Sequence, residues 1–294
     1  MENDNYSRRR FLKTLGLGAA ALSLPSFKLF GNHVSDSYEA NIGLQLYSIR
    51  RQIEKDLEGS IANVAKTGIM GIESYPLPKN LELNFAAKVF RNNGIKIFSM
   101  HNDLPIGAEK DNILRQADAY HCDRAVFAGF PENEKYKDLD TIKKTAETYN
   151  ESYAFLKSRN IKFGLHNHWW EFEKHHDYYP AYYLLEHLDK GIFFEIDTYW
   201  VKTSGQNPAK VVADFGSRAP LLHIKDGPAI KGEKSYEQVP VGQGIMDVPA
   251  IVKAGGKNIK WMIIEFDEYA GNIFEAIQSS YSYLTKNKLG KGNV

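Results

Sequence analysis

Eight short runs rich in strand-forming residues alternate with helical segments along this 294-residue chain. The runs begin near Ile42, Gly71, Ile95, Arg124, Ile161, Gly191, Leu221 and Trp261. Strands that are joined through helices pair in parallel, because the helix carries the chain back to the same edge of the sheet. Eight such units in about 250 residues are typical of a (β/α)8 barrel. We therefore predict an α/β fold, a single-domain TIM barrel.

The alternative arrangement of the same elements is an open, doubly wound sheet. Its nucleotide-binding form carries a GxGxxG loop after the first strand, and no such motif follows the first strand here. Helical periodicity over 57–67 and a long amphipathic run over 138–158 agree with alternating units. Asn207 and Asp247 stand where helix N-caps are expected. The longest connection, 226–246, is predicted to be a functional loop at the barrel mouth.

The N-terminus has the pattern of a targeting segment. Residues 7–13 (SRRRFLK) precede the apolar run 15–24, which is too short to span a bilayer. This segment resembles a twin-arginine export signal, whose S-R-R-x-F-L-K pattern it matches. The resemblance predicts an export signal over about residues 1–33 and a periplasmic barrel over 34–294. No cysteine directly follows the apolar run, so we expect no lipid or membrane anchor.

The charge balance argues against polyanionic partners. Residues 1–33 carry five basic and two acidic side chains, and subtracting these from totals of 37 and 36 leaves 32 basic and 34 acidic. A nearly neutral chain gives no reason to expect nucleic acid or an anionic membrane surface as a partner. The single cysteine, Cys122, excludes an internal disulfide.

Three strands combine an apolar face with a polar end. Read with the two-residue period of a strand, residues 192–197 place Glu195 and Asp197 on the face opposite Ile196. The two later strands show the same alternation. His223 and Lys225 are the polar residues of the first, and Glu265 and Asp267 are those of the second. In a barrel, the C-terminal ends of all strands meet on the face where such enzymes keep their active sites. We therefore expect these side chains to converge.

Other strands end in polar residues as well: Gln45, Tyr47, Glu73, His101, His166 and His168. Carboxylates and imidazoles from neighbouring strands form a mixed oxygen and nitrogen ligand set that suits one Mn²⁺, Zn²⁺, Co²⁺ or Fe²⁺ ion. A single residue of this kind ordinarily caps a strand end or forms an ion pair. Three of them at matching depth, Asp197, His223 and Glu265, favour a metal site.

Four segments carry a family resemblance: 166–172 (HNHWWEF), 195–200 (EIDTYW), 222–226 (LHIKD) and 263–266 (IIEF). Together they resemble the sugar phosphate isomerase/epimerase family, which shares the xylose isomerase-like barrel with endonuclease IV. The resemblance implies a divalent metal held by an acidic residue of strand five, an aspartate of strand six, a histidine of strand seven and a glutamate of strand eight.

Asp197, His223 and Glu265 match the last three of these ligands. Strand five offers His166 in place of the acidic residue, and we predict His166 as the fourth ligand. Many related enzymes also have histidine at the position of Trp200, so substrate contacts do not transfer directly. We predict that the substrate is contacted by Gln45, Tyr47, Glu73, His101 and Trp200.

For catalysis we predict roles for His168, Glu171 and Lys225. His168 and Glu171 are expected either to move protons or to orient a metal ligand. Lys225 is expected to hold an oxyanion, and its alternative role is to neutralise Asp267.

The mechanism that fits is proton abstraction next to a carbonyl through an enediolate, in an isomerase or epimerase acting on a sugar or keto-sugar. One alternative is a lyase or dehydratase for a keto-sugar of the 3-keto-glycoside or inosose type. A second is phosphodiester hydrolysis as in endonuclease IV, which the charge balance disfavours. A third is an exported carbohydrate-binding barrel without catalysis. In the favoured reading the partner is a small carbohydrate.

Overall fold

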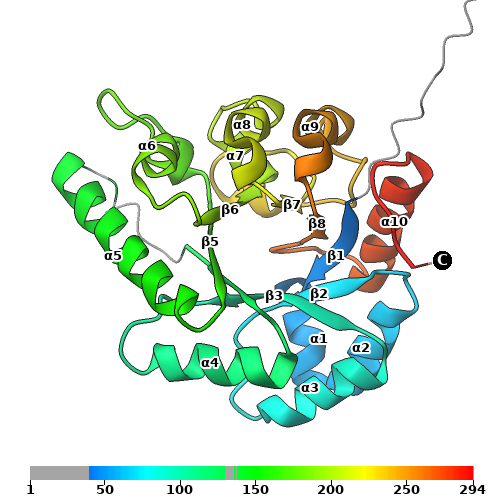
Figure 1. Ribbon diagram of the computed structural model, residues 1–294. Coiled ribbons are helices and arrows are strands. Elements are labelled where there is room, and N and C mark those ends of the chain that lie inside the picture. The colour runs from blue at the N-terminus through cyan, green and yellow to red at the C-terminus, as the bar shows by residue number, and fades with distance from the viewer. Residues whose placement is uncertain (1–39, 130–135, 137, 294) are drawn as a thin grey trace, which may run out of the picture. The chain divides into compact units, whose positions relative to one another are not determined.

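The computed structural model describes residues 40–129, 136 and 138–293. Eight parallel strands close into a barrel in chain order, and β1 pairs with both β2 and β8 (Figure 1). The strands are β1 (Asn41–Gln45), β2 (Gly71–Ser74), β3 (Lys96–Asn102), β4 (Arg124–Phe127), β5 (Lys162–His166), β6 (Phe193–Asp197), β7 (Leu221–Ile224) and β8 (Trp261–Ile264). The predicted fold is confirmed, and every strand starts within two residues of its predicted position. The predicted export signal lies outside the described residues.

Helices surround the strands on the outside of the barrel (Figure 1). They are α1 (Arg50–Lys55), α2 (Leu57–Ala65), α3 (Leu83–Asn92), α4 (Glu109–Tyr120), α5 (Leu139–Lys157), α6 (Pro180–His187), α7 (Thr198–Thr203), α8 (Pro208–Phe215), α9 (Val248–Gly255) and α10 (Ile273–Lys286). Within the described ranges, none of the helices is long and apolar enough to cross a bilayer.

The predicted helix starts are confirmed by their caps. The Asp138 side chain accepts a hydrogen bond from the backbone N–H of Thr141 and begins α5. Asn207 and Asp247 cap α8 and α9 in the same way, each followed by proline in the first helical turn. A side-chain oxygen that accepts an otherwise unsatisfied N–H of the first turn fixes where each helix begins.

An apolar layer closes the N-terminal end of the barrel interior. It consists of Phe98, Val126, Leu221, Trp261 and Ile263, with Met70 and Phe193 packed against it. The rings of Phe98 and Trp261 stack with centroids 3.8 Å apart. Inward-facing glycines make room for these rings, because a Cβ on Gly43 would lie 2.6 Å from the Phe98 ring and one on Gly164 would collide with Phe193. We call this layer the floor of the barrel.

A register shift between β2 and β3 changes which residues face inward. Ile72 pairs with Ile97, whereas the next residue, Glu73, pairs with Ser99. Strict alternation would place Phe98 and His101 on opposite faces, because they are three residues apart. The shift inserts one residue, so that both side chains reach the interior.

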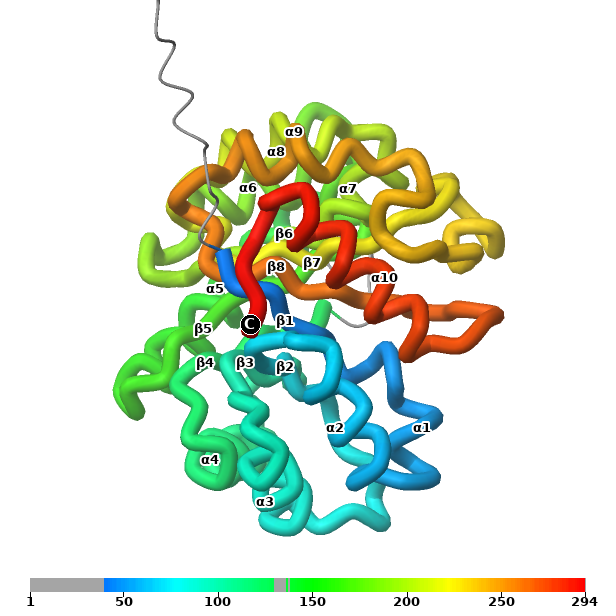
Figure 2. The backbone as a smooth tube through the Cα atoms, turned by 90° about the vertical axis from the view of Figure 1, so that its right-hand side faces the viewer, coloured from blue at the N-terminus to red at the C-terminus, as the bar shows by residue number. Residues whose placement is uncertain are grey.

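Residues near the C-terminus pack against the start of β1. Residues after α10 run beside the start of β1, where Lys291 forms a parallel bridge with Asn41 (Figure 2). The backbone N–H of Lys291 donates to the carbonyl of Ala40 at 2.9 Å.

Candidate active site at the barrel mouth

A cavity of about 360 Å³ opens at the C-terminal ends of the strands. This volume falls in the usual range of small-molecule sites. Seven of the predicted site residues line it: Tyr47, His101, His166, His168, Trp200, Lys225 and Glu265. The remaining predicted residues lie beneath or behind the cavity.

Gln45 and Glu73 lie beneath the cavity and are fully buried. The Gln45 amide donates to Glu73 Oε1 at 2.7 Å, and that oxygen lies 2.9 Å from His223 Nε2. We predicted both as substrate contacts; in the structure neither lines the cavity, and Glu73 contacts His223. Their side chains extend into the barrel from the short strands β1 and β2, one layer below the cavity surface.

The deeper part of the site is a group of three imidazoles around one carboxylate, here called the imidazole group: His101, His166, Glu195 and His223. Glu195 Oε1 lies 2.6 Å from His101 Nε2, 3.2 Å from His166 Nδ1 and 3.0 Å from His223 Nε2. These four residues offer ligand atoms close enough to hold a metal ion. Sequence reasoning predicted the inward direction of Glu195 but not this role. The available signal was its position two residues before Asp197 on the same face.

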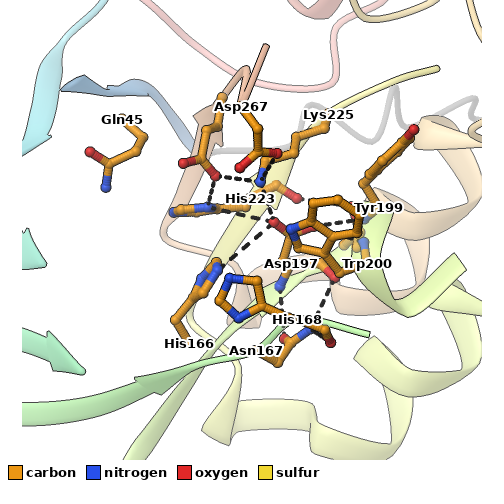
Figure 3. Close-up of polar contacts among 12 residues, drawn as sticks. Gln45, His166, Asn167, His168, Asp197, Tyr199, Trp200, His223, Lys225 and Asp267 are labelled. Carbon is orange, nitrogen blue, oxygen red and sulfur yellow. Dashed lines mark hydrogen bonds and ion pairs between the residues drawn. The ribbon is translucent and has the colours of Figure 1, made fainter. Parts of the chain in front are cut away.

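The upper part of the site is a carboxylate group formed by Asp197, Glu265 and Asp267 around Lys225. The Lys225 ammonium lies 2.8 Å from Asp197 Oδ2, 2.7 Å from Glu265 Oε2 and 2.9 Å from Asp267 Oδ2. Figure 3 shows Lys225 and His223 pointing towards Asp197. Asp197, His223 and Glu265 also offer ligand atoms close enough to hold a metal ion.

The predicted metal quartet is therefore divided. His223 belongs to both groups, Asp197 and Glu265 belong to the carboxylate group, and His166 belongs to the imidazole group. The donor chemistry of both groups fits a divalent ion, because each combines imidazole nitrogen with carboxylate oxygen. One buried atom agrees with this fit: Glu195 Oε2, in the imidazole group, has no hydrogen-bond partner among the described residues.

Neighbouring carboxylates keep Lys225 and His223 positively charged although both are buried. Burial opposes the charge of Lys225, yet Asp197, Asp267 and Glu265 raise its pKa well above the ordinary value. Burial likewise opposes charge on His223, whose pKa is raised by Glu195 and Glu265. A buried charge of this kind is tolerated only when it is paired.

His168 is a neutral imidazole beside the cavity. Burial lowers its pKa well below the ordinary value, and its ring stacks on Trp170 with centroids 4.4 Å apart. The backbone N–H of His168 donates to Glu171 Oε2 at 2.9 Å. Glu171 lies behind the site in a small separate cavity lined also by Tyr136 and Tyr149, and burial raises its pKa to about 8. Glu171 thus holds the His168 segment instead of facing the main cavity.

Aromatic rings form one wall of the cavity. Trp200 is buried and packs against Tyr236, with ring centroids 5.6 Å apart. Its indole ring also packs against the His168 ring (Figure 3). Its indole Nε1 has no hydrogen-bond partner among the described residues. Tyr236 comes from the 226–246 connection, so the predicted location of that loop at the mouth is confirmed. The loop is closed by the Asp226 carboxylate, which accepts from the backbone N–H groups of Gly227, Gly242 and Met246.

The fold and the site define a (β/α)8 barrel with buried imidazoles and carboxylates at the C-terminal ends of its strands. Residues 61–283 match the protein family described as the xylose isomerase-like TIM barrel, and the chain belongs to this family. This agrees with the resemblance seen in the sequence. A comparison with curated protein sequences found no match.

Solved structures share the fold. A sugar phosphate isomerase/epimerase from Parabacteroides distasonis superposes with a TM-score of 0.70 at 21% identity, covering 91% of this chain and 100% of that chain. A D-allulose 3-epimerase from Methylomonas sp. gives 0.62 at 13% identity, covering 85% and 98%. A probable 3-DHS dehydratase from Bacillus anthracis gives 0.62 at 13% identity, covering 83% and 98%. At these identities the similarity establishes the fold.

Proposed function

We propose that this protein is a divalent-metal-dependent isomerase or epimerase that acts on an uncharged sugar or keto-sugar. The observation that carries the proposal is the cavity at the mouth, where the Lys225 ammonium, the neutral His168 imidazole and an aromatic wall face one space. Proton abstraction next to a carbonyl needs a base and a positive group to hold the developing negative charge. The cavity supplies both.

The charge of the lining favours an uncharged substrate. The carboxylates that line the cavity are Asp103, Glu265, Asp267 and Glu268. Glu268 is paired with Arg50 and Arg51, whereas Lys225 is already enclosed by three carboxylates. A phosphate dianion would meet net negative charge here, and like charges at this distance repel.

Each group has a role in the proposed reaction. A divalent ion, held through His223 by either group, would polarise the substrate carbonyl when bound. Lys225 holds the negative charge that develops on the substrate oxygen. His168 accepts the carbon-bound proton and returns it, while Glu171 fixes the His168 backbone. Trp200 offers an apolar face for the sugar ring and an indole N–H for one of its oxygens.

Elimination from a keto-sugar is the second candidate reaction. The Lys225 ammonium that faces the cavity could protonate a leaving β-oxygen after the same proton abstraction. A dehydratase among the solved structures of this fold supports keeping this candidate. A carbohydrate-binding barrel without catalysis is the candidate of another class.

Hydrogen exchange with D₂O tests the proposal. The metal-loaded protein should catalyse exchange of substrate carbon-bound hydrogen for free ketoses or 3-keto-glycosides, whichever product forms. His168→Asn should retain the fold and lose roughly 10²–10⁴-fold in exchange rate, the usual contribution of a general base. His121→Asn, which removes an exposed imidazole at a left-handed position that asparagine tolerates, is the matched control.

Three outcomes would contradict parts of the proposal. A sugar that binds to the metal-loaded protein without exchange would favour the binding barrel. Exchange that survives His168→Asn would move the base to another group, with His101 next because its imidazole also lines the cavity. A preference for phosphorylated over free sugars would overturn the uncharged substrate.

We also propose that the chain is exported to the periplasm by the twin-arginine pathway, on the pattern of residues 7–13. Arg8→Lys combined with Arg9→Lys should retain the protein in the cytoplasm, and fractionation followed by blotting measures this. Normal export of the double variant would contradict the signal.

A further inference from the structure

His223 presents a different ring nitrogen to each of the two groups. Its Nε2 lies 3.0 Å from Glu195 Oε1 and 2.9 Å from Glu73 Oε1. Its Nδ1 lies 2.5 Å from Glu265 Oε2 and 3.9 Å from Asp197 Oδ2. A metal bound through His223 must therefore lie on one side of the ring or the other, and the surroundings of the two nitrogens differ.

The Nδ1 side already contains a cation. The Lys225 ammonium lies 2.8 Å from Asp197 Oδ2 and 2.7 Å from Glu265 Oε2, the two oxygens on the Nδ1 side of His223, and Lys225 is 1% exposed. The other oxygen of Asp197 accepts from the backbone N–H groups of Tyr199 and Trp200 and caps α7. A metal could enter only if the ammonium left its carboxylates, and an ammonium without partners is poorly tolerated inside a protein.

The Nε2 side has the spacing of a metal site. Glu195 Oε1 is 2.6–3.2 Å from one nitrogen of each of the three imidazoles, and all four ligand atoms lie within 4.8 Å of one another. Tetrahedral Zn²⁺ with bonds of about 2.0–2.1 Å separates neighbouring ligand atoms by roughly 3.3 Å. Small shifts of the four side chains would bring the donors to that spacing, with the imidazoles moving slightly away from Glu195 Oε1.

Surrounding contacts suit these residues to be ligands. With Nε2 directed at a metal, His223 would donate from Nδ1 to Glu265, the carboxylate–histidine pairing that orients metal-binding imidazoles. Glu195 Oε2 is fully buried and has no hydrogen-bond partner among the described residues. His101 and His166 line the cavity, so an ion held by them would be within reach of a substrate.

We propose that the divalent metal binds in the imidazole group, to His101, His166, Glu195 and Nε2 of His223, and that Lys225 is the resident cation of the carboxylate group. The inference rests on the proposed function only for the presence of a metal. Three imidazoles and one carboxylate suit Zn²⁺, Fe²⁺ or Co²⁺ better than Mg²⁺ or Mn²⁺, which prefer oxygen ligands.

X-ray absorption spectroscopy of the full chain loaded with Zn²⁺ tests the site without a variant. The imidazole group predicts three imidazole ligands per zinc. The carboxylate group, with His223 as its only histidine, predicts one. A count of one would overturn the inference while leaving a metal-dependent enzyme intact.

Matched variants give the second test, with metal content measured by elemental analysis after dialysis. Glu195→Gln should weaken Zn²⁺ binding by more than the roughly 10–100-fold typical of losing a group that only orients a ligand. Asp197→Asn should keep the metal, because asparagine still caps α7. His121→Asn removes an exposed imidazole and controls for adventitious zinc.

The outcomes separate this inference from the proposed function. Loss of zinc in Asp197→Asn but not in Glu195→Gln would place the metal in the carboxylate group and overturn the inference. A wild-type chain that binds no zinc, iron or cobalt would overturn it too, while D₂O exchange independently decides whether the protein is an enzyme. If a variant fails to fold, the number of imidazole ligands per zinc in the wild type, measured by X-ray absorption, decides between the two groups.

Discussion

Two layers of the barrel interior lie one pleat apart on the same strands and differ completely in chemistry. Phe193, Leu221 and Ile263 belong to the apolar floor. Two residues further along the chain are Glu195 on β6, His223 on β7 and Glu265 directly after β8. The floor closes the barrel by packing. The layer of Glu195, His223 and Glu265, here called the upper layer, holds buried charges that are stabilised by pairing instead of by water. The comparison indicates that stability and chemistry are divided between successive layers of one barrel.

The two layers differ in how their contribution to the stability of the fold depends on pH. Apolar burial in the floor does not depend on protonation. The upper layer depends on it, because its imidazoles and carboxylates must keep complementary charges. Changes in the two layers should therefore separate loss of fold from loss of function.

The largest effect on stability is expected in the floor. Trp261→Ala removes a buried ring stacked on Phe98 and should lower the free energy of unfolding by about 3–5 kcal/mol. Phe85→Ala, at a ring that is 45% exposed, is the control and should change it by less than about 0.5 kcal/mol. Chemical denaturation measures both. Equal effects of the two substitutions would show that the floor does not hold the barrel closed.

A smaller, pH-dependent effect on the free energy of unfolding is expected at Glu171, which lies behind the site. Burial raises the pKa of Glu171 from 4.5 to about 8, so the folded state keeps this carboxyl protonated where the unfolded chain ionises it. The wild type should therefore lose stability as the pH rises from about 4.5 to about 8, and Glu171→Gln should not. The difference between them should grow by on the order of a few kcal/mol across that window.

Denaturation of both proteins at pH 5 and pH 8 measures this difference. Glu147→Gln, at an exposed position of α5, is the matched control and should behave alike at both values. If the difference in unfolding free energy between Glu171→Gln and wild type were the same at both pH values, the Glu171 carboxyl would be solvated. The expected difference in pH dependence between the floor and the polar residues would then be contradicted.

Much of the site could be predicted from local pattern. Alternation along the sixth, seventh and eighth strands placed Asp197, His223 and Glu265 on the inner face, and the structure brings them together. The caps Asn207 and Asp247 were predictable for the same reason, because a capping side chain acts on the next turn of its own helix.

Other features of the site could be seen only in the tertiary structure. The register shift in β3 turns both Phe98 and His101 inward, and no two-residue period predicts that. Glu171 follows His168 by three residues, yet the turn between them directs its carboxyl away from the cavity.

The sequence by itself determined the alternating elements, the helix starts and the inward face of the polar strand ends, because these depend on periods of a few residues. The tertiary structure decided which inward residues meet. Strand stagger around a closed barrel brings Glu195 to His101 and His223, residues 94 and 28 positions away. It also surrounds Lys225 with three carboxylates, one at the end of β6 and two just after β8. Such contacts depend on the position of each strand relative to its neighbours, which no local period encodes.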